Sequence, residues 1–402
     1  MFGIGFSNAP NTPDPPVRIN IIHMGFFYSG GGERVAIQQA LGLRRRGHEV
    51  KVYSPIIYAD KSFPDQLRQV GPERLVPHLP FPFPFRESSA MLASAVFPFG
   101  IMKVADCDVM LCHSQPSMWL GLRLNSLHGV PYVGYLHQLT TFIHPRPAIG
   151  EDWNTGDFQL LDGIVGGIGK PIARSLDRLC HARASRLLFN SEWTKRLFAE
   201  AYGLGGETVY PGIASHGPVA PGERKGQVVT AARHYPWKRI DLTFEVLAKM
   251  KQKSLKLVVT SKETPYTAVL KRRVRLLGLE DRVTFTGFVP DDALARIMTE
   301  SKGYVQTSIQ EPFGLSPVEA QSYGLPAVVW GDAGMRETVI DGETGFLAKP
   351  YDTQDFAEKL DAIVSDPPLW SRMSREAENW SQRFGWESHL DKLEAALAEA
   401  KR

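Results

Sequence analysis

The chain has 402 residues, of which 43% are hydrophobic and 22% are charged. At roughly 100–200 residues per domain, this length predicts about two domains, each long enough to bury an apolar core. The composition excludes a fibrous, collagen-like or low-complexity protein. The net charge of +3 is too close to neutral to indicate a nucleic-acid partner.

The compartment and the relation to membranes are predicted from the cysteines and the apolar segments. The three cysteines form no CxxC pair, which favours a reducing compartment over a disulfide framework. Residues 1–16 lack the basic start and apolar stretch of a signal peptide. The most apolar window, 91–105, is interrupted by Pro98 and Gly100 and is shorter than the ~20 residues of a spanning helix. We therefore expect a soluble, cytoplasmic protein that contacts the cytoplasmic face of a membrane at most peripherally.

Strand-like and helix-like segments alternate along the first half of the chain. The helix predicted at 34–46 has apolar residues at helical spacing and separates two strand-like runs, which makes a βαβ unit. Such alternation predicts a parallel sheet with helices on both faces. The strands predicted in this half are 18–23, 49–53, 109–112, 131–136 and 186–189.

A segment rich in Pro and Gly, 210–226, interrupts the alternation and predicts a linker between domains. We expect an N-terminal Rossmann-like domain over 1–213, a C-terminal Rossmann-like domain over 214–383, and a closing helix over 386–401. The strands predicted in the second half are 227–232, 255–260, 282–286, 303–307 and 326–330.

Ligands of open α/β sheets bind beyond the carboxyl ends of the strands, so two such sheets facing one another would leave a ligand cleft. The first candidate segment, 28–34, follows the first strand and contains Gly30, Gly31 and Gly32. Glycines let the backbone approach a ligand, and the following helix offers free N–H groups to phosphate. The alternative is a flexible turn. The spacing is not GxGxxG, and no acidic residue ends the next strand, which disfavours a dinucleotide site.

The second candidate segment, 311–319, lies between a predicted strand and a helix. Its last four residues predict a capping box, with Ser316 as the N-cap and Glu319 at the third helical position. That purely structural interpretation leaves Glu311 unexplained. Carboxylates here could accept hydrogen bonds from the hydroxyls of a sugar and a ribose. The three residues with backbone N–H groups free to cradle a phosphate are Phe313, Gly314 and Leu315.

Two further candidates also follow predicted strands. Arg233 and Lys238 could grip a diphosphate, although most basic turns are simply solvated. His137 ends a strand of the first sheet, where an ordinary hydrogen-bonding role is the alternative.

These segments together resemble the family 4 retaining glycosyltransferases, which have the two-domain GT-B fold. The most specific feature is the E-x7-E pattern, met by Glu311 and Glu319, and the one departure is Ala333-Gly334, where many members carry Gly-Gly. Other matching segments are the glycine-rich loop through Glu33, the Arg233 and Lys238 pair, and residues 189–194, 323–329 and 337–347.

The resemblance implies a role for each matching residue. Arg233 and Lys238 would bind the donor diphosphate, Glu319 the nucleotide ribose and Glu311 the transferred sugar. His137 would lie near the sugar and the acceptor. The groups flanking the phosphates would be the amides of Phe313, Gly314 and Leu315 together with Gly30, Gly31 and Gly32.

The reaction implied is transfer of a sugar from a nucleotide diphosphate sugar to a hydroxyl with retained configuration. Catalysis would be mostly positioning and stabilisation of the leaving diphosphate, with no metal or cofactor required. Asp106 and Asp108 imitate a DxD metal motif but precede a strand, so we interpret them as a turn. In this family the first domain binds the acceptor, and the last helix, within 384–402, crosses back to it.

The acceptor is indicated only weakly. Aromatic residues beside arginine in 78–86, and the apolar 91–105, could dock a lipid carrier or a membrane; ordinary packing is the alternative. The hypothesis is transfer of a sugar to a glycan or lipid-linked acceptor, and mannose is the candidate sugar because residues 238–241 and 330–334 resemble mannosyl-type members. A nucleotide-sugar epimerase of the same architecture, which needs no acceptor, is the main alternative. A noncatalytic sugar-nucleotide binding protein is disfavoured by the charged residues of the site.

Overall fold

The computed structural model describes residues 16–75, 104–140, 143–144, 169–214 and 224–401. Two segments were predicted to contact the acceptor or a membrane. Segment 78–86 lies outside the described residues, and so does segment 91–105 except for residues 104 and 105. Within the described part, no helix is long and apolar enough to cross a bilayer.

The first half of the chain forms a seven-stranded sheet in the order β3-β2-β1-β4-β5-β6-β7, and every pairing in it is parallel. All five predicted strands are present, and two short edge strands, β3 and β7, were not predicted. The strands are β1 (Arg18–His23), β2 (Glu49–Ser54), β3 (Glu73–Arg74), β4 (Val109–His113), β5 (Tyr132–Leu136), β6 (Arg186–Phe189) and β7 (Glu207–Thr208). Its helices are α1 (Gly31–Arg45), α2 (Pro64–Val70), α5 (Ser114–His128), α7 (Gly169–Ala182) and α8 (Glu192–Tyr202).

The second half forms a six-stranded parallel sheet in the order β10-β9-β8-β11-β12-β13. Only the edge strand β13 was not predicted. The strands are β8 (Gln227–Ala231), β9 (Lys256–Thr260), β10 (Val283–Gly287), β11 (Tyr304–Gln306), β12 (Ala327–Trp330) and β13 (Gly345–Ala348). The helices are η3 (Pro236–Lys238), α9 (Ile240–Lys249), α10 (Thr267–Leu276), α11 (Asp291–Glu300), α12 (Leu315–Ser322), η4 (Ala333–Glu337) and α13 (Thr353–Ser365).

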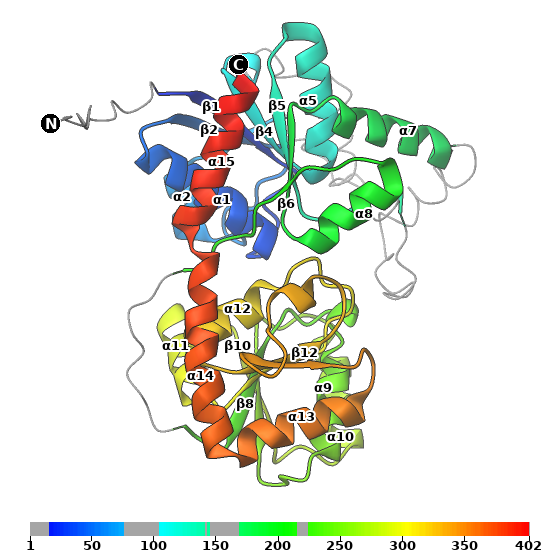
Figure 1. Ribbon diagram of the computed structural model, residues 1–402, viewed down its shortest axis with the longest axis vertical. Helices are drawn as coiled ribbons and strands as arrows, with labels where there is room; N and C mark the ends of the chain where they lie inside the picture. The colour runs from blue at the N-terminus through cyan, green and yellow to red at the C-terminus, as the bar shows by residue number, and fades with distance from the viewer. Residues whose placement is uncertain (1–15, 76–103, 141–142, 145–168, 215–223, 402) are drawn as a thin grey trace, which may run out of the picture.

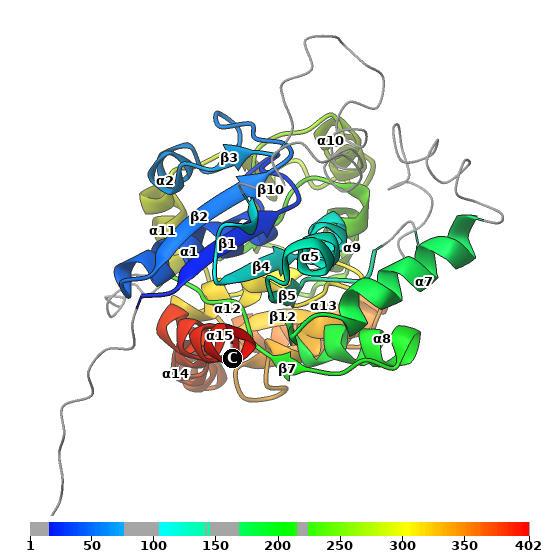
Figure 2. The same ribbon diagram turned by 90° about the horizontal axis from the view of Figure 1, so that it is seen from above.

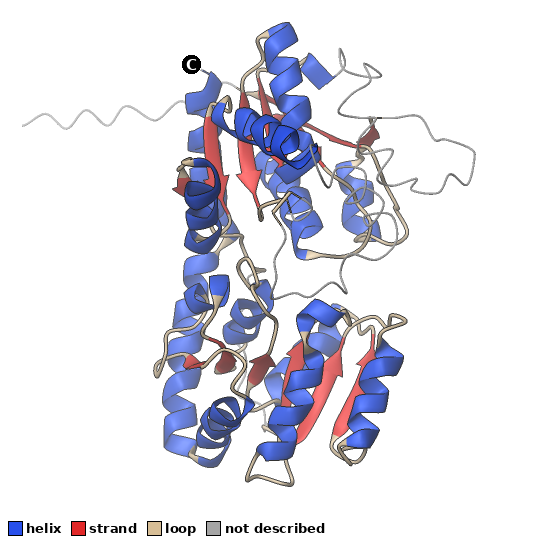
Figure 3. Ribbon diagram, turned by 90° about the vertical axis from the view of Figure 1, so that its right-hand side faces the viewer, coloured by secondary structure: helices blue, strands red, loops and turns tan. Residues whose placement is uncertain are grey.

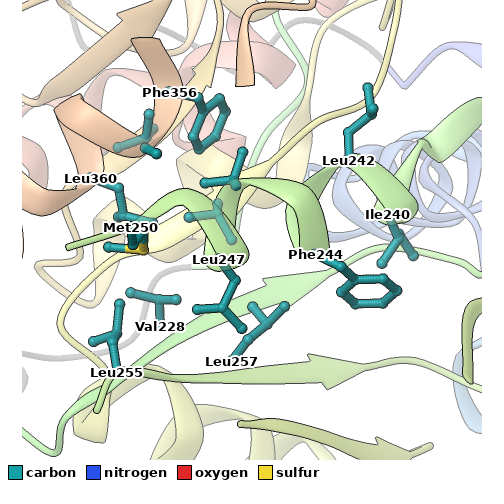
Figure 4. Close-up of a cluster of buried hydrophobic side chains, with 14 of the residues drawn as sticks. Val228, Ile240, Leu242, Phe244, Leu247, Met250, Leu255, Leu257, Phe356 and Leu360 are labelled. Carbon is teal, nitrogen blue, oxygen red and sulfur yellow. The ribbon is translucent and has the colours of Figure 1, made fainter. Parts of the chain in front are cut away.

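Each sheet buries an apolar core under its helices. In the second domain, α9 turns Phe244 and Leu247 onto the sheet against Val228 and Leu257, all at most 2% exposed (Figure 4). Such burial contributes roughly 1.5–3 kcal/mol for each large side chain, which favours the closed sheet-and-helix layers over the extended chain. The predicted class, two Rossmann-like α/β domains, is therefore confirmed.

The predicted closing helix is present as α15 (Trp386–Lys401), after α14 (Pro367–Ser381) and η5 (Gln382–Phe384). Helix α14 lies on the second domain and α15 on the first, so the end of the chain runs along both (Figures 1 and 3). Leu390 and Leu393 of α15 join the core of the first sheet. Arg46 Nη1 and His48 Nε2 each lie 2.8 Å from the Glu394 carboxylate and tie α15 to the end of α1.

The predicted start of α12 was wrong. The helix begins at Leu315, with Gly314 as the N-cap, so Ser316 is inside the helix and caps nothing. Gly314 has a φ of 102°, and a Cβ there would lie 2.5 Å from Met335 Sδ, so both backbone conformation and close packing require glycine. A tertiary contact therefore overrides the local capping signal, and Glu319 is freed from a capping role.

Candidate active site

The order of the strands fixes where a ligand site should lie. In both sheets the chain reverses its direction of winding beside the first strand, between β1 and β4 and between β8 and β11. Open α/β sheets bind ligands at such switch points, beyond the carboxyl ends of the strands. Seen from the side, the strands of the two sheets point toward each other, so both switch points face the junction between the domains (Figure 3).

The three glycines follow β1 and form the start of α1 rather than a free loop. Helix α1 begins at Gly31, three residues earlier than predicted, and Gly30 is its N-cap. The first N–H groups of a helix have no intrahelical partner and carry a partial positive charge, so this end suits an anion. A Cβ on Gly31 would lie 3.2 Å from Leu315 Cδ1, so this end directly meets the start of α12 in the second domain.

The segment before α12 is packed tightly between the domains. The Phe313 ring is 3% exposed and packs against Tyr210 and Phe384, with ring centroids 5.4 and 5.6 Å apart. The Gly334 N–H donates to the Glu311 carbonyl at 3.0 Å. Ala333, which departs from the family pattern, has a φ of 50° in the left-handed region that favours glycine. Packing therefore fixes the backbone of 311–314, which includes two of the three amides predicted to meet phosphate, those of Phe313 and Gly314.

Two predicted residues of the second domain form an ion pair. Lys238, at the end of η3 after β8, places its Nζ 2.5 Å from Glu311 Oε2, which follows β11. Both side chains are largely buried, at 15% and 19% exposed. The pair thus spans the switch point of the second sheet, a contact that the sequence interpretation did not predict.

Arg233 also follows β8 but faces the other domain. Its guanidinium lies 4.0 Å from the ring centroid of Tyr28, in the segment between β1 and α1. Tyr235 flanks it on its own side at 5.4 Å. Stacking on aromatic faces holds a guanidinium in one plane, and Arg233 also makes a side-chain hydrogen bond with Tyr28. Tyr28 begins the candidate segment 28–34, but the sequence interpretation gave it no role. No local pattern links Tyr28 to Arg233, which lies 205 positions further along the chain.

Glu319 pairs with a cation of the first domain. Its Oε1 accepts a hydrogen bond from Arg34 Nη1 in a short contact, with the two side chains 26% and 39% exposed. Arg34 lies in the second turn of α1 and also sits 5.3 Å from the Phe63 ring centroid. The predicted ribose-binding carboxylate therefore faces the junction but is engaged by Arg34, which ends the candidate segment 28–34 and was given no role of its own there.

His137 directly follows β5 and is half-buried within a cluster of histidines. Its Nε2 lies 3.2 Å from His113 Nδ1, and Tyr135 packs against both rings. Burial, with a smaller contribution from the charge of His389, lowers the pKa of His137 to about 4. His137 is therefore neutral near pH 7, and its position at a strand end of the first sheet agrees with the predicted placement.

A further interdomain contact, made by Glu337, was not predicted either. The Glu337 carboxylate, at the end of η4, accepts the backbone N–H groups of Glu192 and Trp193 at 2.8 and 2.7 Å. It also accepts the Tyr210 hydroxyl at 2.9 Å. A carboxylate of one domain thus caps the first turn of α8 in the other, a favourable arrangement for both charge and hydrogen bonding. The Ser191 hydroxyl donates to the Pro312 carbonyl at 2.6 Å beside it.

The DxD-like segment is a structural turn, as predicted. Asp106 and Asp108 both pair with Arg18, at 2.7 and 2.9 Å, just before β4. Across the part of the chain that the structure describes, no group of three or more His, Cys, Asp or Glu residues could hold a metal ion.

Two parallel-sheet α/β domains whose switch points face one another define a GT-B-type two-domain fold. Two family models divide the chain between them: "Glycosyltransferase Family 4" matches residues 29–215 and "Glycosyl transferases group 1" matches residues 215–380. The chain belongs to the family 4 glycosyltransferases.

Curated relatives carry glycosyltransferase names. A D-inositol 3-phosphate glycosyltransferase of Kribbella flavida is 32% identical, over 70% of this chain and 68% of the relative. A protein of the same name from Rhodococcus opacus is 25% identical over 91% of this chain and 84% of its own. These matches do not favour the epimerase alternative.

Solved structures agree on the fold. HepE of Anabaena, solved with UDP-glucose, has a TM-score of 0.73 and 22% identity, covering 95% of this chain and 99% of its own. A sucrose-phosphate synthase of Thermosynechococcus elongatus has a TM-score of 0.71 and 18% identity, covering 94% and 97%. At these identities the likeness establishes the fold.

Proposed function

We propose that this glycosyltransferase transfers a hexose from a nucleotide diphosphate sugar to a hydroxyl of a glycan or lipid-linked acceptor, with retention of configuration. The observation that carries the proposal is the convergence of groups suited to each part of such a donor. The α1 N-terminus, Arg233 and Lys238 suit the diphosphate, whereas Glu311 and Glu319 suit hydroxyls. Mannose is the first sugar to test, and the UDP-glucose bound by HepE makes glucose the second.

The proposed chemistry is electrostatic. As the sugar–phosphate bond breaks, negative charge grows on the leaving diphosphate, and Arg233, Lys238 and the amides of 313–315 stabilise it from fixed positions. The departing phosphate takes the acceptor proton, so neutral His137 positions the sugar and acceptor. The protein side chains supply this stabilisation without a metal or cofactor. Residues up to 213 would bind the acceptor and residues 214–383 the donor.

A thermal-shift panel tests the donor class. Because a ligand that binds only the folded state stabilises it, nucleotide diphosphates and their sugars should raise the melting temperature. Matched nucleoside monophosphates should do so less, since they lack the second phosphate. The donor that binds is then offered to glycan and lipid-linked acceptors, and the anomeric configuration of the product is read by NMR. Turnover of the donor to an isomeric sugar nucleotide with no acceptor product would instead favour an epimerase.

A further inference from the structure

A buried carboxyl lies beside Tyr28, the ring that stacks on Arg233 of the proposed phosphate site. Glu33, in the first turn of α1, is 6% exposed. A methyl group built on Gly30 would lie 2.5 Å from Glu33 Oε2 and 2.6 Å from Tyr28 Cε2, so the carboxyl packs beside the ring that covers Arg233. Within the described part of the chain, Glu33 forms no ion pair within 4.0 Å. The family roles given above do not use it.

The surroundings of Glu33 favour its neutral form unusually strongly for a glutamate. Burial raises its pKa to about 7, although its own backbone N–H and the charge of Arg233 both act in the opposite direction. Tyr28, whose pKa is raised chiefly by burial, faces the same space as a neutral phenol. Nearby His23, whose pKa burial lowers to about 3, is neutral as well.

Among the described residues, a second cation close to Glu33 is already engaged. Arg34, next to Glu33 in the chain, points at Glu319 of the second domain. Arg233 is therefore the cation that a carboxylate at Glu33 and an incoming diphosphate would share. Two negative groups competing for one arginine in a space with little water repel each other strongly, and protonation of the weaker acid removes the repulsion.

We propose that Glu33 takes up a proton when a nucleotide diphosphate sugar binds beside Arg233, and that the neutral carboxyl donates a hydrogen bond within the site. The inference rests on the proposed function, because it assumes that the diphosphate binds Arg233. The proton comes from solvent and is returned when the diphosphate leaves. No bond to carbon forms or breaks in this step.

The affinity for the nucleotide sugar depends on pH because its binding is coupled to protonation of Glu33. Below the pKa of the free protein Glu33 is already protonated, so binding there needs no proton. Above it, binding must bring in a proton, and affinity falls with rising pH by up to about tenfold per pH unit. Each phosphate of a nucleotide diphosphate sugar has one ester bond and one anhydride bond, so its single acidic oxygen stays ionised throughout and the ligand itself adds no titration in this range.

Isothermal titration calorimetry at pH 7.5, in phosphate and in Tris buffer, measures the proton uptake. The probes are UDP-glucose and GDP-mannose, and whichever binds is used for all variants. We expect a net uptake of up to about one proton for the unaltered chain and none for Glu33→Gln, whose affinity should also lose its fall between pH 7 and 8.5. Glu399→Gln, an exposed carboxylate paired with Arg186, is the control and should behave like the unaltered chain.

Three outcomes would overturn the inference or its basis, and they are distinguishable. Binding with no proton uptake, or with equal uptake in Glu33→Gln, contradicts the role of Glu33 and leaves the proposed function intact. No binding of either nucleotide sugar contradicts the proposed function itself. If Glu33→Gln does not fold, as judged by its thermal transition, the pH dependence of the unaltered chain decides: a flat affinity above pH 7 contradicts the inference.

Discussion

Lys238 Nζ lies 2.5 Å from Glu311 Oε2, and this ion pair joins the two strand ends that flank the switch point of the second sheet. In the proposed reaction the two groups serve different parts of one donor, the lysine a phosphate and the carboxylate a sugar hydroxyl. The pair holds both side chains in place before the donor arrives, so little rearrangement is needed at the site when it binds.

The first prediction concerns that pair. Lys238→Ala and Glu311→Gln should each lower the rate of transfer by about 10²–10³-fold, because each removes a fixed group that stabilises the reacting donor. The thermal transition should remain cooperative in both variants. The matched control is Lys225→Ala, which removes an exposed lysine 2.6 Å from Glu300 and should leave transfer unchanged. Near-normal turnover in Lys238→Ala or Glu311→Gln would contradict the assigned roles.

The Arg34–Glu319 pair leads to two opposite predictions. Glu319→Ala should weaken donor binding by about tenfold or more, since the ribose loses a charged acceptor. Arg34→Ala should strengthen donor binding by up to about fivefold, because a half-exposed pair worth about 1 kcal/mol no longer competes for the carboxylate. Calorimetric affinities of the two variants check this. Equal weakening in both would mean that Arg34 itself binds the donor.

The contact of Glu337 with α8 predicts a role in holding the domains together. Glu337→Ala leaves two N–H groups and the Tyr210 hydroxyl without their acceptor, so we expect a lower melting temperature and a larger radius of gyration by small-angle scattering. Tyr210→Phe, which removes one of the three bonds, should have a smaller effect. The control is Glu343→Gln, an exposed carboxylate in the following turn. An unchanged radius in Glu337→Ala would exclude a domain-holding role.

The buried histidines predict acid sensitivity. Burial lowers the pKa values of His137 and His389 to about 4, whereas both should titrate near 6.5 in the unfolded chain. Between these values the unfolded state binds more protons, so stability rises with pH and is complete above about pH 6.5. The limiting slope is about 1.4 kcal/mol per pH unit for each histidine. Urea midpoints measured from pH 4.5 to 7.5 test this, and a constant midpoint would contradict it.

The fold was predictable because its signals are local. Helix α15 was predicted with its observed bounds, since its apolar residues recur at helical spacing over a long segment with no breaker. The interior strands were also found, as short, mostly apolar runs between helix-like segments. The edge strands β3 and β7 have two residues each and are defined by pairing with a neighbour, which no local pattern records.

The site was predictable only in part. Gly30–Gly32, Arg233, Lys238 and Glu311 follow strands, and the rule on ligand placement was enough to select them. The start of α12 was missed because Gly334 and Met335, distant in sequence, set the backbone around Gly314. The contacts of Arg34 with Glu319 and of Tyr28 with Arg233 were missed because they too join residues that are distant in sequence. The Glu33 carboxyl looked like an ordinary charge at a helix start until its burial was known.

The central claim is that the facing switch points of the two sheets bind a nucleotide diphosphate sugar. The most direct test is a crystal structure of the chain with UDP-glucose or GDP-mannose, whichever raises its melting temperature. The account predicts the diphosphate within hydrogen-bonding distance of Arg233 and Lys238, with the sugar at Glu311 and the ribose at Glu319. Density for the nucleotide sugar at any other place, with Lys238 still bound to Glu311, would contradict it.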